Sequence, residues 1–167
     1  KLIDEVEGFS DVERETTYRV GVINGGNFVN VIPTECHAEV LCVAPTPEAF
    51  AEVQQRMSSL ASPDPDVRLV VKSGPVRPLF AMQPATEELY DVARRVARDV
   101  GLDLSHGQFG GGSDGNFTGA LGIPTLDGLG VCGDGVHTKQ EHLLVSSLVP
   151  RARLFAGLLE ALAERNR

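Results

Sequence analysis

Two stretches of this sequence carry residue types that could do chemistry. Residues 110–115 read Gly-Gly-Gly-Ser-Asp-Gly, and a lone histidine, His137, follows in a polar loop. Successive glycines leave backbone amides uncovered, and amides at a helix start can hold an anionic group or a developing oxyanion. An exposed imidazole can bind a metal or transfer a proton. Together the two stretches predict the pocket end of a hydrolase.

The glycine run also matches G-x-S-x-G, the nucleophile elbow of serine hydrolases. Ser113 stands at its centre, and Asp127 or Asp134 and then His137 follow in the chain order of that triad. The elbow requires an apolar strand leading directly into the serine, whereas residues 105–110 are polar and glycine-rich. A serine hydrolase using Ser113 and His137 is the alternative to a metal-dependent one.

A metal site around His137 would need ligands from elsewhere. Zinc takes three or four protein ligands, and the sequence contains no His-Glu-x-x-His motif. The three cysteines, Cys36, Cys42 and Cys132, are odd in number and lack the Cys-x-x-Cys spacing of a zinc site or disulfide framework. Reduced thiols of this kind favour a cytoplasmic protein.

Composition excludes two classes of partner. The 167 residues carry a formal net charge of −8, whereas nucleic-acid binders normally present a basic face. Apolar residues make up 42% of the chain, and no uninterrupted run approaches the length of a membrane span. We therefore expect neither nucleic acid nor membrane as a partner.

The sequence predicts both strands and helices to position these residues. Alternating and β-branched stretches predict strands at 16–23, 34–43 and 67–72, and apolar residues at helical spacing predict helices at 1–7, 46–60, 86–100 and 146–164. Thr46 and Thr86 are the expected helix caps. The predicted class is α/β, beginning with an α+β unit in which helices cover one face of an antiparallel sheet.

Side-chain parity assigns a buried face to the second strand. Alternate residues of this strand are expected to point into the core: Cys36, Ala38, Val40 and Cys42. The other face carries Glu35, His37, Glu39 and Leu41. The inward face expected for the last helix is Leu148, Leu154, Leu158 and Leu159. Prolines between Gly74 and Pro84 indicate an extended crossing. The predicted boundary therefore divides residues 1–74 from residues 75–167.

Three segments together resemble the zinc aminoacylase and carboxypeptidase family, which includes glutamate carboxypeptidases, acetylornithine deacetylase and succinyl-diaminopimelate desuccinylase. They are residues 25–33 (Gly-Gly-Asn-Phe-Val-Asn-Val-Ile-Pro), residues 110–114 and the glycine-framed segment 130–141 around His137. Their order and spacing agree with the family over essentially the whole chain. The resemblance implies a catalytic domain with two zinc ions and an inserted lid domain that dimerises.

By the same resemblance, residues 1–74 are most of the lid, without its N-terminal strand, and residues 75–167 are the C-terminal part of the α/β catalytic domain. His137 matches the last metal ligand, and Asn30 matches a lid residue that reaches the substrate or its oxyanion. The loop that frames the bound acyl or carboxylate group is matched by Gly110, Gly111, Gly112 and Ser113.

The chain also departs from the family pattern. The other zinc ligands and the glutamate that acts as general base are expected upstream of Lys1, so the chain is predicted to be a fragment with little activity alone. Leu41 stands where an arginine often binds a substrate carboxylate. The implied function is hydrolysis of an amide bond in an N-acyl amino acid or small peptide by a homodimer; a non-catalytic dimerisation module is the remaining alternative.

Overall fold

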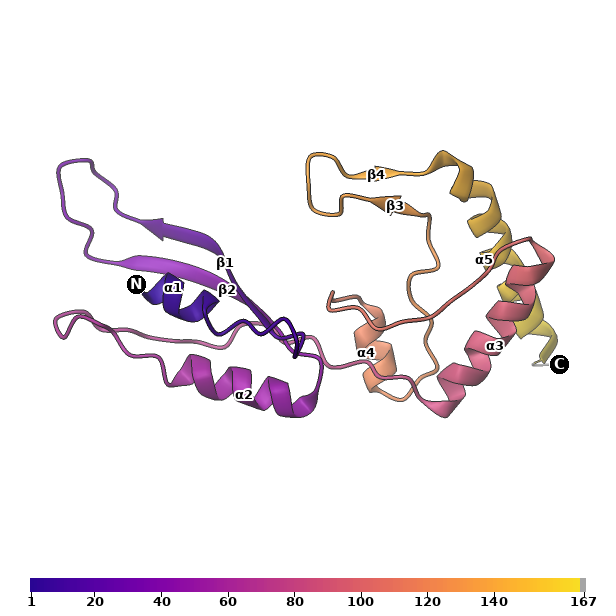
Figure 1. The fold of residues 1–167 in the computed structure, drawn as a ribbon, viewed down its shortest axis with the longest axis horizontal. Coiled ribbons are helices and arrows are strands. Elements are labelled where there is room, and N and C mark those ends of the chain that lie inside the picture. Colours follow the sequence, from indigo (N-terminus) through magenta and orange to yellow (C-terminus); the bar gives the residue numbers. More distant parts are fainter. Residues whose placement is uncertain (166–167) are drawn as a thin grey trace. The chain divides into compact units, whose positions relative to one another are not determined.

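The computed structural model describes residues 1–165, which divide into two compact units. The first unit contains Lys1–Leu79 together with Phe109–Gly111, and the second contains Phe80–Gln108 and the described residues from Gly112 onward. Figure 1 shows each unit as a small antiparallel ladder with helices beside it. The predicted α/β class is confirmed.

The first unit is built on a long two-stranded ladder. Strand β1 (Thr17–Gly25) pairs antiparallel with β2 (Cys36–Val43), and the register shifts between Val20 and Val22. Helices α1 (Leu2–Glu7) and α2 (Pro47–Ser58) complete the unit. Its core is formed by Val6 from α1, Tyr18 from β1 and Val53 from α2.

Helix α2 begins as the sequence predicts. The Thr46 hydroxyl accepts a hydrogen bond from the Ala49 amide at 3.2 Å, and Pro47 occupies the first turn, where its missing N–H costs nothing. The cap therefore determines where the chain leaves the ladder and starts the helix that covers Tyr18.

Two expectations for the first unit are wrong. Residues 67–72 form no strand, and Val67 and Val70 are exposed. A segment with high β propensity forms a strand only where it can pair with a neighbouring strand. Cys36 and Ala38 are also exposed, although the parity is correct at Val40 and Cys42, which pack on the core. Alternation buries only those residues of a strand that another element covers.

The second unit rests on two packed helices, α3 (Pro84–Asp99) and α5 (Val145–Arg165). Val92 and Ala93 from α3 meet Leu158 from α5 in the core. A short helix, α4 (Gly115–Ala120), and a hairpin of β3 (Gly133–Asp134) and β4 (His142–Leu143) lie between them in sequence. In Figure 1 the chain passes from β4 directly into α5.

The helix ends of this unit differ in detail from the predictions. Helix α3 begins at Pro84 with Gln83 at the cap position, so Thr86 is a buried first-turn residue and no cap. Leu154 and Leu158 are buried as expected, but Leu148 and Leu159 are exposed because α5 packs against a helix on one side only. Within residues 1–165, no helix combines the length and the apolar character needed to cross a membrane.

Candidate functional site

His137 lies at the tip of the β3–β4 hairpin. The ladder pairs Gly133 with Leu143 and Asp134 with His142, and residues 135–141 connect the strands. The His137 backbone has a φ of 65°, the left-handed region that residues other than glycine rarely adopt. Such backbones persist only where the surroundings enforce them, and they cluster at functional sites.

Hydrogen bonds within residues 135–141 hold His137 in this backbone conformation. The His137 amide donates to Glu141 Oε2 at 3.3 Å, and the Thr138 amide and hydroxyl both donate to the Gly135 carbonyl, at 2.9 and 2.6 Å. The Gln140 amide donates in turn to the Thr138 hydroxyl at 3.1 Å. Sequence reasoning singled out His137 and missed Thr138 and Glu141, although polar residues beside an Asp-Gly turn are the usual signal for such bracing.

The two histidines of this hairpin differ in what their rings do. The His142 ring places Nδ1 2.9 Å from the Gln140 carbonyl, whereas the exposed His137 ring makes no hydrogen bond or ion pair within residues 1–165. Among the described residues, both nitrogens of the His137 ring are therefore without a partner, whereas His142 keeps only Nε2 free.

A complete metal site is not present in the part of the chain that the structure describes. No group of three or more histidine, cysteine, aspartate or glutamate side chains is placed to hold an ion there. Zinc takes three or four protein ligands. His137 thus fits one ligand position, and the remaining donors would have to come from outside these residues.

The glycine run ends in a hydrogen-bonded turn just before α4. The Ser113 amide donates to Asn116 Oδ1 at 2.8 Å, and the Ser113 hydroxyl accepts from the Gly115 amide at 3.1 Å, while Asp114 occupies the cap position of the helix. The Ser113 amide is therefore occupied. The amides of Gly110, Gly111 and Gly112 donate no hydrogen bond to any described residue.

The same geometry weighs against a nucleophilic serine. Residues 102–109 contain no strand to form the elbow, and no hydrogen bond joins Ser113 to His137 within residues 1–165. A serine nucleophile needs a base within hydrogen-bond reach. The structure thus offers no support for the triad that the sequence left open.

The lid residues singled out by sequence belong to the first unit. Asn30 is exposed in the connection between β1 and β2, which Gly26 opens with a φ of 75°. Leu41 is 66% exposed and has the strand parity of His37 and Glu39, whose Nε2 and Oε1 atoms lie 3.7 Å apart. Each unit is described by itself, so Asn30 and His137 are placed on separate scaffolds.

Known proteins resemble the chain along nearly all of its length. It is 28% identical over 92% of its length to the uncharacterized protein YqjE of Bacillus subtilis (strain 168), 24% identical over 95% to carboxypeptidase G2 of Pseudomonas sp. (strain RS-16), and 31% identical over 89% to succinyl-diaminopimelate desuccinylase of Polaromonas sp. (strain JS666 / ATCC BAA-500). The chain spans 42%, 39% and 34% of the length of these relatives.

A family model supplies the assignment. It matches residues 8–161, which include the ladder with the Asn30 connection, the glycine run and the His137 hairpin. These are the segments that suggested the family from sequence. The chain belongs to peptidase family M20/M25/M40.

Proposed function

We propose that this chain forms part of a dinuclear zinc amidohydrolase that cleaves an amide bond in an N-acyl amino acid or a small peptide. The observation that carries the proposal is the His137 hairpin in a chain of this peptidase family. The hairpin holds an exposed imidazole, without a partner among residues 1–165, at a left-handed backbone position. The names of two relatives, a carboxypeptidase and a desuccinylase, agree with cleavage of an amide next to a carboxylate-bearing group.

Each site residue has a distinct task in this proposal. His137 holds one zinc ion. Asn30 binds the acyl or carboxylate group of the substrate together with the amides of Gly110, Gly111 and Gly112, which donate to no described residue. When bound, the zinc pair supplies Lewis-acid chemistry, because it makes water nucleophilic near neutral pH and polarises the scissile carbonyl. The general base, a glutamate, comes from polypeptide outside this chain.

The specificity we propose does not depend on an arginine at position 41. An arginine grips a carboxylate through two parallel hydrogen bonds, and the exposed Leu41 side chain has no donor. A substrate with an apolar or small group at this place therefore suits the chain better than one that needs a second carboxylate clamp.

We assign the lid function to the first unit and propose that a cytoplasmic homodimer forms through it. Light scattering of the 167-residue chain at high concentration tests this assignment. A dimer supports it, and a strict monomer contradicts it.

The central test compares two histidines of one hairpin in the complete zinc enzyme. We expect His137→Ala to lower zinc affinity and kcat by at least about 100-fold, because each ligand and its surroundings contribute strongly to metal affinity. His142→Ala is the matched control and is expected to change either quantity by less than about threefold. Equal effects of the two variants would contradict the assignment.

Chelation separates the zinc enzyme from the serine hydrolase. We expect EDTA to abolish hydrolysis, zinc to restore it, and a fluorophosphonate to leave Ser113 unlabelled. Stoichiometric labelling of Ser113 with chelator-resistant activity would instead establish the serine enzyme. The 167-residue chain alone, with one zinc donor at His137, is expected to show no metal-dependent peptidase activity; hydrolysis at an enzyme-like rate would contradict this.

A further inference from the structure

The His137 hairpin has few contacts of its own to keep it in place. Its ladder contains two residue pairs, and Gly133, Asp134, His142 and Leu143 are all exposed. Two-stranded hairpins are marginally stable without a further contact. The orientation of His137 therefore depends on what holds the base of the hairpin.

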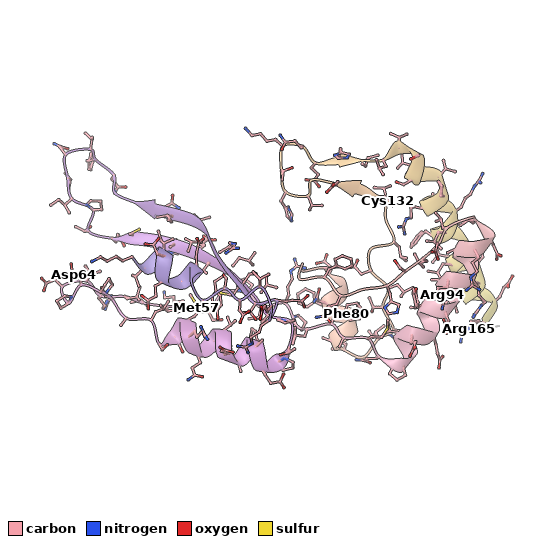
Figure 2. All side chains as sticks on the ribbon, in the orientation of Figure 1. Met57, Asp64, Phe80, Arg94, Cys132 and Arg165 are labelled. Atoms are coloured by element: carbon pink, nitrogen blue, oxygen red, sulfur yellow. The ribbon has the colours of Figure 1, made fainter. Side chains whose placement is uncertain are left out.

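One hydroxyl joins both strands at that base. Ser147 Oγ, in the first turn of α5, accepts a hydrogen bond from the Cys132 amide at 2.9 Å and donates to the Leu144 carbonyl at 2.7 Å. The Leu144 amide donates to the Cys132 carbonyl at 2.8 Å, which adds one more backbone pairing below the ladder. Figure 2 labels Cys132 beside β3.

A second α5 side chain reaches the same residue. Arg151 lies one turn after Ser147 and places Nη2 3.5 Å from Cys132 Sγ. Its Nε and Nη1 atoms are buried and make no hydrogen bond to any described residue. Buried donors without partners are costly, so we expect this guanidinium to lower the stability of the unit although it contacts Cys132.

We infer that Ser147 and Arg151 are positioning residues that clamp the base of the hairpin to α5 and so orient His137 toward its metal. The inference rests on the proposed role of His137 as a zinc ligand. Groups that orient a metal ligand typically contribute 10- to 100-fold to metal affinity. Ser147 and Arg151 act through Cys132 and touch neither metal nor substrate in this account.

The first test removes the Ser147 hydroxyl. In the 167-residue chain, Ser147→Ala is expected to speed amide hydrogen exchange at Cys132 by roughly 5- to 10-fold, the loss of about one hydrogen bond. In the zinc enzyme the same variant should weaken zinc binding by about 10-fold, with kcat recovered at saturating zinc. Ser147→Thr should restore both quantities, and Ser146→Ala, at the exposed neighbouring serine, should change neither.

The second test separates positioning from stability. Arg151→Met retains an apolar stem and removes the two buried unsatisfied donors, so it should raise the melting temperature of the chain while it weakens zinc binding by a few-fold to 10-fold. A purely structural role would move both quantities in the same direction. Arg153→Met, at an exposed arginine of the same helix, is the control and should leave both unchanged.

The outcomes distinguish this inference from the proposed function. Unchanged zinc affinity in Ser147→Ala and Arg151→Met, in an enzyme where His137→Ala abolishes zinc binding, would overturn the clamp and leave the function intact. Unchanged zinc affinity in His137→Ala would overturn the proposed function. Unchanged exchange at Cys132 in Ser147→Ala would overturn the clamp by itself.

Discussion

The two hairpins of this chain are opposites: β1–β2 has a long ladder and a connection with few hydrogen bonds, whereas β3–β4 has a short ladder and a connection with many. The β1–β2 ladder runs from Thr17 to Gly25 on one strand, but its connection, which contains Asn30, has one internal backbone hydrogen bond, from Val31 to Phe28 at 3.4 Å. The β3–β4 ladder has two pairs, but its connection is braced at nearly every residue. A long ladder places a tip in a general region, whereas local bracing fixes one residue in one backbone conformation.

This difference suits the two proposed roles. A metal ligand must keep its geometry within a few tenths of an ångström, and the braced loop around His137 provides such a scaffold. A residue that reaches a substrate has to close over it, and the loosely braced connection around Asn30 leaves that freedom. Four predictions test this contrast between the two hairpins.

The largest effect is expected from a methyl group at the start of the braced connection. Gly135 has a φ of 72°, and a Cβ there would lie 2.9 Å from the Gln140 carbonyl oxygen, which belongs to the backbone and cannot easily move. Gly135→Ala should therefore lower the free energy of hairpin opening by at least about 2 kcal/mol. Amide exchange of Glu141 is the measurement.

Gly26→Ala is the matched change in the other hairpin. Gly26 has nearly the same φ, 75°, but its added Cβ would meet the Pro33 side chain at 3.0 Å. We expect a cost of about 1 kcal/mol, the left-handed penalty alone. An equal or larger cost for Gly26→Ala would refute the view that the His137 connection is the more rigid one.

The second prediction concerns the strain at His137. His137→Gly should make the chain more stable than His137→Ala by about 0.5–1 kcal/mol, because glycine adopts a φ of 65° without steric penalty. Urea unfolding of the two variants measures this difference. Alanine and glycine variants of equal stability would show that the backbone at position 137 is unstrained.

The third prediction tests the carboxylate that holds the His137 amide. Glu141→Ala should speed amide exchange at His137 about twofold, a loss of about 0.5 kcal/mol, since the 3.3 Å hydrogen bond is long and exposed. Glu141→Gln keeps an acceptor oxygen and should retain most of the protection. If the glutamine variant exchanges as fast as the alanine variant, the hydrogen bond depends on the negative charge.

The smallest effect is expected in the helix beside the long ladder. Hydrogen bonds from Arg14 and Arg56, at 2.7 and 2.6 Å, hold the pKa of Glu52 below its ordinary value of 4.5. A lowered folded-state pKa contributes stability above the unfolded pKa, and that contribution is lost as pH falls below about 4.5 through the folded value.

Glu52→Gln should therefore lower stability slightly at neutral pH and flatten its decline in acid. Melting temperatures measured from pH 7 to pH 3 check both points. Glu48→Gln, at an exposed glutamate of the same helix, should retain the acid decline. An unchanged pH profile in Glu52→Gln would show that the ion pairs with Arg14 and Arg56 contribute nothing measurable.

Local signals in the sequence predicted much of this structure. The Thr46 cap of α2 and the antiparallel pairing of β1 with β2 follow from local sequence patterns, and both are present. The expected strand at 67–72 is absent because a strand also needs a neighbour with free backbone groups, which no local pattern reports.

In the candidate site, too, the sequence predicted the residues but not their tertiary contacts. The sequence singled out His137 and the glycine run by residue type, and it identified the family through their order with the Asn30 connection. It did not reveal that the Ser113 amide donates to the Asn116 side chain, that Glu141 holds the His137 amide, or that Ser147 joins both sides of the hairpin base. These contacts depend on the path of the backbone, and residue spacing does not specify that path.

Residue types and their order thus determined by themselves the α/β class and the peptidase family, and they singled out His137 as the proposed metal ligand. Only the tertiary structure decided that this imidazole has no partner within residues 1–165, that its backbone is left-handed, and that Ser147 and Arg151 of α5 contact Cys132 at the base of its hairpin. The physical reason is that chemical identity belongs to a residue alone, whereas strain, exposure and hydrogen-bond satisfaction depend on neighbours brought together by the fold.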